Sequence, residues 1–127
     1  MARILLVDDD SGIRSLLTLV LEREGFDVIV TDSAEAALAG ARSHKVDLLL
    51  TDVSMPGASG HEIARRVREL QPDSSVLLMS GSPEYLEMGR VPPSTALIEK
   101  PFDPMALVSC IRALLRRRGN THLGRTA

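Results

Sequence analysis

The stretch Arg3-Ile-Leu-Leu-Val-Asp-Asp-Asp10 decides the fold of this chain. A continuous apolar run that ends abruptly in acidic residues predicts a β-strand buried on both faces, as strands of parallel sheets are. Residues 11–24, which follow, carry apolar side chains at helical spacing, and Gly25 can end that helix. A buried strand followed by a helix is the unit from which parallel α/β sheets are built.

The same alternation of apolar run and amphipathic stretch recurs along the 127 residues. Four further strands are expected at 27–30, 46–50, 75–79 and 96–98. Side chains that commonly cap helices precede the first three helices, namely Ser11, Asp32 and Ser59. Ser82-Pro83 opens a fourth helix that Pro92-Pro93 should keep short, and Asp103-Pro104 opens the last helix. The sequence therefore predicts an α/β fold, a doubly wound sheet of five parallel strands with helices on both faces.

Composition excludes several classes of protein. The formal net charge is −2, which argues against a dedicated nucleic-acid binder. Aromatic residues make up only 2%, too few to build a platform on which bases could stack. The single cysteine, Cys110, excludes an internal disulfide and a cysteine-based zinc site, and we interpret it as a core residue. We find neither a membrane span nor a signal peptide, so we expect a cytoplasmic protein without a membrane partner.

Polar side chains follow the predicted strands at the points where they end. The carboxyl ends of the strands meet at one edge of such a sheet, where functional clefts form. This brings together Asp8, Asp9, Asp52, Ser80 and Lys100. Three crowded carboxylates repel one another unless a cation joins them, and oxygen ligands with open positions suit Mg²⁺. Lys100 is a candidate functional residue because lysine is scarce in this arginine-rich chain. Its compact point charge suits a partner carboxylate or a phosphoryl oxygen.

The motifs around these residues resemble the receiver domain of two-component response regulators. The resemblance extends from Ile4 to about Leu115. It is carried by four motifs in a fixed order, Val7-Asp8-Asp9-Asp10, Leu50-Thr51-Asp52-Val53-Ser54-Met55-Pro56-Gly57 with Ser59-Gly60, Met79-Ser80-Gly81 and Glu99-Lys100-Pro101-Phe102. It implies a flavodoxin-like strand order of 2-1-3-4-5, a cis Lys100–Pro101 bond and a tight turn at Gly60.

The resemblance also implies a chemistry for this edge of the sheet. Asp52 matches the residue that accepts a phosphoryl group from a phosphohistidine or from a small phosphodonor such as acetyl phosphate. Asp9 matches the direct ligand of Mg²⁺, and Asp8 matches the residue that acts through water. Asp52 itself and the backbone carbonyl of Ser54 match the remaining protein ligands.

Further roles follow from the same resemblance. Ser80 matches the switch hydroxyl and Lys100 the cation that pairs with the phosphoryl group. Ser54 and Ser82, each two residues after a site residue, match positions that tune the phosphoryl lifetime. The implied partners are a sensor histidine kinase or a histidine phosphotransfer domain, together with a downstream effector of unknown kind. Direct nucleic-acid binding is not expected.

Domain organisation is expected to be simple, with a receiver domain at 1–118 and a polar tail at 119–127. Both a free-standing receiver and a fragment of a longer regulator or hybrid kinase are compatible with this length. Related domains commonly pair through the fourth and fifth helices and the last strand. Because the fourth helix is expected to be short, we expect a monomer.

Two alternative functions stay open. Receivers often carry Tyr or Phe three residues before the lysine, where this chain has Leu97. That departure suits a protein-interaction module that keeps the fold without being phosphorylated. The pair Asp8 and Asp10 formally fits a hydrolase that forms an aspartyl phosphate, although the chain has no room for a substrate cap. Asp10, beside Ser11, is also readily explained as a helix cap.

Overall fold

The computed structural model describes residues 1–81 and 94–126, with side chains up to Arg117. The expected short fourth helix and the position of Ser82 lie outside the described residues. Within the described residues the five strands are β1 Arg3–Val7, β2 Asp27–Thr31, β3 Leu48–Asp52, β4 Ser75–Ser80 and β5 Thr95–Glu99. The helices are α1 Ser11–Arg23, α2 Ala34–Ser43, α3 Gly60–Leu70 and α5 Pro104–Thr126.

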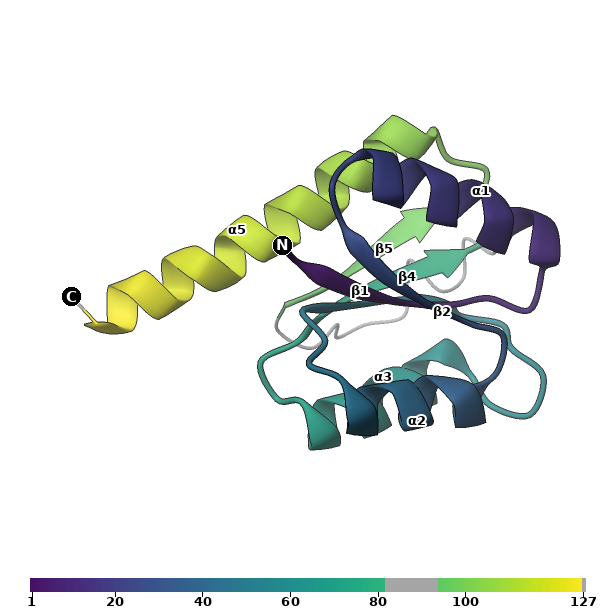
Figure 1. Ribbon diagram of the computed structural model, residues 1–127, viewed down its shortest axis with the longest axis horizontal. Helices are drawn as coiled ribbons and strands as arrows, with labels where there is room; N and C mark the ends of the chain where they lie inside the picture. Colours follow the sequence, from purple (N-terminus) through teal and green to yellow (C-terminus); the bar gives the residue numbers. More distant parts are fainter. Residues whose placement is uncertain (82–93, 127) are drawn as a thin grey trace.

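The strands form one sheet in the order β2-β1-β3-β4-β5, and every neighbouring pair is parallel. This confirms the predicted doubly wound α/β fold. Helices α1 and α5 lie on one face of the sheet, and helices α2 and α3 lie on the other (Figure 1). Strand β1 lies inside the sheet, which explains why its apolar run is continuous.

Side chains of the central strands divide strictly between two cores. Leu6 of β1 and Leu50 of β3 face α1 and α5, while Leu5 and Leu49 face α2 and α3. All four are fully buried, and burying such a side chain contributes about 1.5–3 kcal/mol. Cys110 packs against the first core, in agreement with its interpretation as a core residue. Because neighbouring residues of a strand face opposite cores, a shift by one residue would place every side chain on the wrong face. The alternation therefore fixes the register of the strands and the position of their ends.

The helix starts decide between neighbouring candidate caps. Of the two candidates before α1, Asp10 is the cap and Ser11 is not, because the Asp10 side chain accepts hydrogen bonds from the backbone N–H groups of Gly12 and Ile13. Ser33, not Asp32, caps α2, so this cap lies one residue away from the predicted position. The ambiguity arises because several residues of capping type stand side by side.

The cap of α3 was predicted correctly, since Ser59 accepts from the N–H of Glu62. Gly60 follows directly, and its backbone N–H donates to the carbonyl of Val53 at 2.8 Å. A Cβ atom on Gly60 would lie 2.3 Å from the carbonyl oxygen of Asp52. Glycine is therefore required here, because the start of α3 packs directly against the backbone that carries Asp52.

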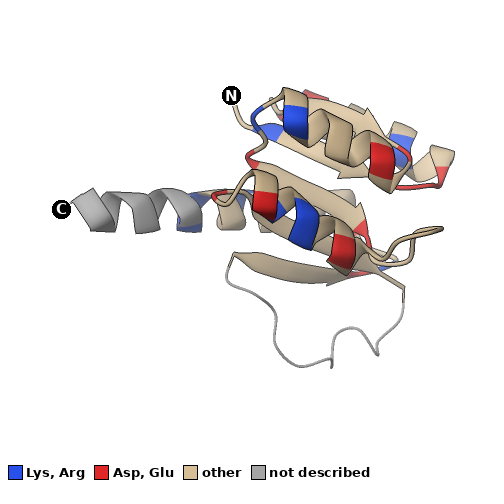
Figure 2. Cartoon of the chain, turned by 90° about the horizontal axis from the view of Figure 1, so that it is seen from below, with Lys and Arg blue, Asp and Glu red and all other residues tan. Residues whose placement is uncertain are grey.

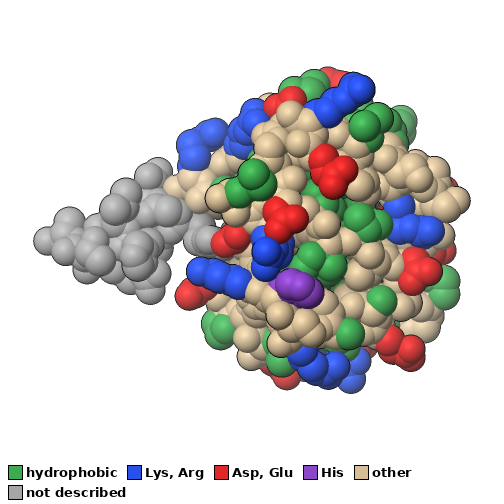
Figure 3. All heavy atoms as spheres, viewed as in Figure 1, with side chains coloured by type: hydrophobic (Ala, Val, Ile, Leu, Met, Phe, Trp, Pro, Cys, Tyr) green, Lys and Arg blue, Asp and Glu red, His purple; other side chains and the backbone are tan. Residues whose placement is uncertain are grey.

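The surface carries charges of both signs. Arginine and glutamate residues are interspersed along α2 and α3 (Figure 2), and charges of both signs are scattered over the face seen in Figure 3. None of the helices within the described residues is long and apolar enough to span a membrane. Helix α5 continues to Thr126, through residues that the sequence analysis assigned to a tail.

Candidate functional site

The site lies where the carboxyl ends of four strands meet. Strand β1 leads into Asp8, β3 ends at Asp52, β4 ends at Ser80, and Lys100 follows β5. Register brings these ends level, because Asp52 is paired with Met79, the residue before Ser80. The backbone N–H of Lys100 donates to the carbonyl of Ser80 at 2.7 Å, which fixes the start of the loop after β5.

Three carboxylates converge at this edge, as predicted. One oxygen each of Asp8, Asp9 and Asp52 lies within 4.8 Å of the other two. Asp8 is fully buried and Asp9 is exposed. The side chain of Asp52 is 14% exposed, so it is shielded on most sides yet reachable from solvent. Negative charge is thus concentrated in one place and opens outward at Asp9.

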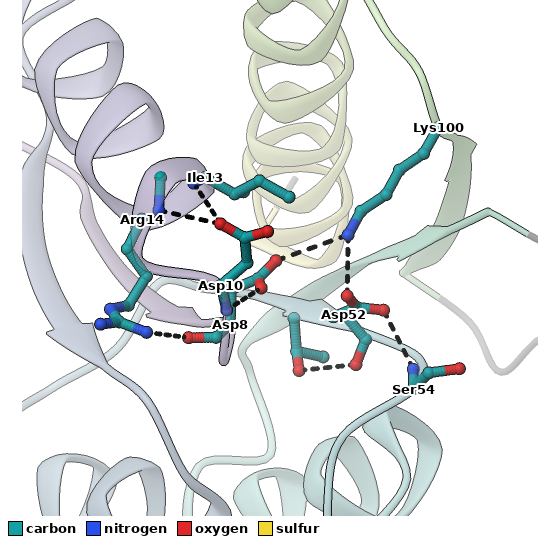
Figure 4. A network of polar contacts seen from close by, with 9 residues as sticks. Asp8, Asp10, Ile13, Arg14, Asp52, Ser54 and Lys100 are labelled. Atoms are coloured by element: carbon teal, nitrogen blue, oxygen red, sulfur yellow. Dashed lines mark hydrogen bonds and ion pairs between the residues drawn. The ribbon is translucent and has the colours of Figure 1, made fainter.

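Lys100 is the cation of this cluster. Its Nζ atom lies 2.7 Å from Asp52 Oδ2 and 3.6 Å from Asp8 Oδ2 (Figure 4). Burial alone would lower the pKa of Lys100, but the hydrogen bond to Asp52 and the negative charges of both aspartates outweigh it and raise the pKa. The lysine therefore stays charged at neutral pH and bridges two of the three acids.

The surroundings of the Asp8 carboxyl group disfavour its charged form. Its Oδ1 atom accepts from the N–H of Asp10 at 2.9 Å, while Oδ2 is buried without a hydrogen-bond partner among the described residues. Desolvation raises the pKa of Asp8 and outweighs the lowering by the Asp10 N–H and by Lys100. A buried carboxylate oxygen without a donor is costly, which points to a further positive ligand at this place.

The loop that follows Asp52 borders an open depression of about 610 Å³ beside the end of β3. The loop after the strand lines it, from Val53 to Ser59, together with Asp9. Ser54 is exposed, and its backbone N–H donates to Asp52 Oδ1 at 3.0 Å. With Lys100 on Oδ2, both oxygens of the Asp52 carboxylate are therefore oriented by donors.

The residues present fit Mg²⁺. The donors are hard oxygens, the exposed side opens to water, and Asp8, one of the three acids, has a buried oxygen that accepts no hydrogen bond from the residues described. Mg²⁺ prefers one or two carboxylates and keeps several waters, which matches a half-open cluster better than a closed cage.

Ser80 is buried at the end of β4, in line with the other groups, and the Lys100–Pro101 peptide is cis, as the resemblance implied. Leu97 lies in β5 and packs against the core formed with α2 and α3. One residue of this edge was missed. Arg14 of α1 donates from Nη1 to the backbone carbonyl of Asp8 at 2.8 Å. Its helical position gave no signal, since an arginine at that spacing is typical of an exposed helix face.

The chain matches a known protein family over most of its length. The family model described as the response regulator receiver domain matches residues 4–112. The transcriptional regulatory protein ResD of Bacillus subtilis is 35% identical over 120 residues, which cover 94% of this chain and 50% of ResD. The chain thus spans about half the length of the curated relatives it matches.

Solved structures agree with the fold. A CheY-like response regulator receiver domain protein from Methanospirillum hungatei has a TM-score of 0.83 at 29% identity, covering 95% of this chain and 98% of that one. The response regulator TrrA of Thermotoga maritima, solved in complex with Mg²⁺ and BeF, has a TM-score of 0.78 at 31% identity, covering 90% of this chain and 99% of that one.

Proposed function

This chain belongs to the response regulator receiver domain family, and from that premise we propose that Asp52 is its phosphoryl acceptor in a two-component pathway. The observation that carries this assignment is the Asp52 carboxylate itself. Donors on Lys100 and Ser54 orient its two oxygens, its side chain is 14% exposed, and the loop that follows it lines an open depression. The family resemblance also points to Asp52, and among the three carboxylates of the cluster it is the one with a hydrogen-bond donor at each oxygen within the described part of the chain.

Asp8, Asp9 and Asp52, with the backbone carbonyl of Ser54, would hold Mg²⁺ as part of this proposal. The oxygen cluster and the buried Asp8 oxygen that accepts no hydrogen bond within residues 1–81 and 94–117 support it, as does the Mg²⁺–BeF complex of TrrA. A bound Mg²⁺ supplies positive charge that offsets the charge of phosphoryl oxygens. Lys100 supplies a second positive charge at Asp52 Oδ2.

The proposed step is a transfer between two nucleophiles. A carboxylate oxygen of Asp52 attacks the phosphorus atom of a phosphohistidine, an O–P bond forms, and the N–P bond breaks. The imidazole keeps the electron pair of the broken bond and is then free to bind a proton. Because such transfers depend mainly on positioning and charge, the fixed Asp52 carboxylate and the nearby Lys100 ammonium supply the protein's share.

The modified Asp52 would act as a switch. Ser80 lies at the end of the neighbouring strand, and its hydroxyl is the group proposed to bond to the phosphoryl oxygen. The added charge can then favour a second arrangement of the loops at this edge. Hydrolysis of the acyl phosphate resets the domain.

The proposed partners are a sensor histidine kinase or a histidine phosphotransfer domain, and an effector that recognises the phosphorylated form. Activity as part of a longer regulator is likewise a proposal, with the receiver boundary near 118. Cytoplasmic location completes it, because phosphodonors made from ATP are found there.

Mass spectrometry tests the assignment directly. Incubation with Mg²⁺ and acetyl phosphate, or with a phosphorylated kinase, should add one phosphoryl group to the wild type and none to Asp52→Asn. Asp10→Asn is the matched control, since asparagine caps a helix as well as aspartate and Asp10 lies outside the carboxylate cluster. If no donor modifies the wild type, the proposal is overturned and the unphosphorylated interaction module becomes the better account. Modification of Asp8 instead of Asp52 would favour the hydrolase hypothesis.

A further inference from the structure

The peptide that joins Asp8 to Asp9 determines where the exposed carboxylate of the cluster stands. Within the described part of the chain, no hydrogen bond holds the side chain of Asp9. Its place within 4.8 Å of the Asp8 and Asp52 oxygens therefore depends on its backbone. What holds the backbone of residues 8–10 therefore determines where the Asp9 carboxylate lies.

Asp8 is tied on several sides. Its N–H donates to the carbonyl of Thr31 in β2 at 3.3 Å, and its Oδ1 accepts from the N–H of Asp10. These bonds fix the amide and the side chain of Asp8. Its carbonyl, which belongs to the same peptide plane as the N–H of Asp9, is held by Arg14.

Arg14 is well placed for this task. It stands in the first turn of α1, where its own N–H donates to the carbonyl of Asp10 at 3.0 Å. From there the half-buried side chain turns back and donates from Nη1 to the Asp8 carbonyl at 2.8 Å (Figure 4). Asp10 caps the same helix. Helix α1 therefore holds residues 8–10, the acidic turn, at two points, by the Asp10 side chain and by the Arg14 guanidinium.

Arg14 and Lys100 contact different parts of the acidic turn. Lys100 faces the carboxylate oxygens, whereas Arg14 bonds to a backbone oxygen. A planar guanidinium with donors in a fixed arrangement is suited to hold a carbonyl in one orientation. The effect of Arg14 on the cluster is therefore geometric.

We propose that Arg14 is a positioning residue, whose bond to the Asp8 carbonyl sets the Asp8–Asp9 peptide so that the Asp9 carboxylate points into the cation site. This inference rests on the proposed function, because it assigns a residue to the Mg²⁺ site proposed there. Partners behind the ligands of a metal typically change affinity 10–100-fold when they are removed, and we expect about tenfold weaker Mg²⁺ binding in Arg14→Gln.

The test compares Arg14→Gln with Arg112→Gln. Arg112 also donates from a guanidinium nitrogen to a backbone carbonyl of the α1 region, that of Glu24 at 3.2 Å, but at the opposite end of the helix. Two quantities are measured in both variants and in the wild type. The first is the Kd for Mg²⁺ by calorimetry, and the second is the hydrogen-exchange rate of the Asp10 amide in metal-free protein. Thermal unfolding reports the loss of stability in each.

Arg14→Gln should raise the Kd about tenfold and speed exchange of the Asp10 amide, while Arg112→Gln should change neither. With acetyl phosphate, the Mg²⁺ concentration needed for half-maximal phosphorylation should rise, with a nearly unchanged rate at saturation. If Arg14→Gln only lowers the melting temperature, as Arg112→Gln does, the positioning role is overturned. If Arg14→Gln does not fold, Arg14→Lys keeps the stem and the charge, and a wild-type Kd in that variant overturns the geometric role.

The two measurements also separate this inference from the proposed function. A wild type that binds no Mg²⁺ overturns the proposed function. The hydrogen-exchange rate of the Asp10 amide then shows by itself whether Arg14 orders the acidic turn. A wild type that binds Mg²⁺ with an unchanged Kd in Arg14→Gln overturns only the role of Arg14.

Discussion

The ammonium group of Lys100 reaches over strand β4 and donates a hydrogen bond to Asp52 Oδ2 at 2.7 Å, although 48 residues separate the two in sequence. Their side chains are 22% and 14% exposed, so water screens the pair only in part. The contact joins β3 to the loop after β5 and neutralises part of the acidic cluster. It therefore contributes to stability as well as to the proposed chemistry.

Lys100→Met should lower the free energy of unfolding at neutral pH by about 1–3 kcal/mol, because Asp52 loses a charged hydrogen-bond partner and Asp8 loses its nearest cation. Urea unfolding in metal-free buffer measures the change. Lys45→Met is the control, since Lys45 is the other lysine and is exposed. Equal stability of the two variants would show that the pair contributes nothing to folding.

Asp8→Asn should stabilise the metal-free protein at neutral pH. Burial raises the pKa of Asp8 above its ordinary value of 3.8, so the folded protein holds this proton to a higher pH than the unfolded chain. Stability contributed by the neutral group is therefore present at low pH and is lost as the pH rises from about 3.8 through the folded pKa. Asparagine keeps the neutral form at every pH and can still accept from the Asp10 N–H.

Thermal unfolding of Asp8→Asn and wild type from pH 3 to 8 measures this linkage. The difference in stability should be small near the acidic end and should grow toward neutral pH. The same variant should bind Mg²⁺ more weakly. The substitution would therefore stabilise the metal-free protein and weaken the proposed metal site. A wild type that is more stable than Asp8→Asn at neutral pH without metal would contradict the direction of the pKa shift.

Most of the site could be predicted from the sequence because it depends on topology. Once apolar runs and helical stretches alternate, the carboxyl ends of the strands must meet, and Asp8, Asp52 and Lys100 stand directly after such runs. Arg14 could not be found in this way, because its contact is with a backbone carbonyl and depends on how α1 turns back toward β1. The cap of α2 was misplaced by one residue, and that of α1 was left open between Asp10 and Ser11, for a related reason. Neighbouring polar residues have similar capping preferences, and only the backbone conformation selects among them.

Gly60→Ala should disturb both stability and the site. A Cβ atom would lie 2.3 Å from the carbonyl oxygen of Asp52 and 2.9 Å from Val53 Cα, and backbone atoms cannot give way as a flexible side chain can. We expect a loss of about 1–3 kcal/mol, typical of overpacking, together with slower phosphorylation because the strand end moves. Gly40→Ala is the control, since a Cβ there has its nearest contacts at 3.4 Å and the residue lies inside α2. Unfolding and phosphorylation assays that give the same values for both variants would show that this close approach is not needed.

Mg²⁺ should raise the thermal stability of the wild type, and the gain should grow with the logarithm of its concentration above the Kd. A ligand that binds only the folded state adds about 2.7 kcal/mol at a concentration of 100 times its Kd.

Asp9→Asn removes the exposed carboxylate of the cluster while leaving the Lys100 pair with Asp52 in place, so the apo protein should fold normally. Its melting temperature should respond weakly to added Mg²⁺, and a chelator should return the wild type to the same value as untreated metal-free protein. Ca²⁺ in place of Mg²⁺ tests the preference for a small ion with retained waters. An equal Mg²⁺ response in wild type and Asp9→Asn would place the ion away from these three carboxylates, because an ion held there cannot lose a charged ligand without losing affinity.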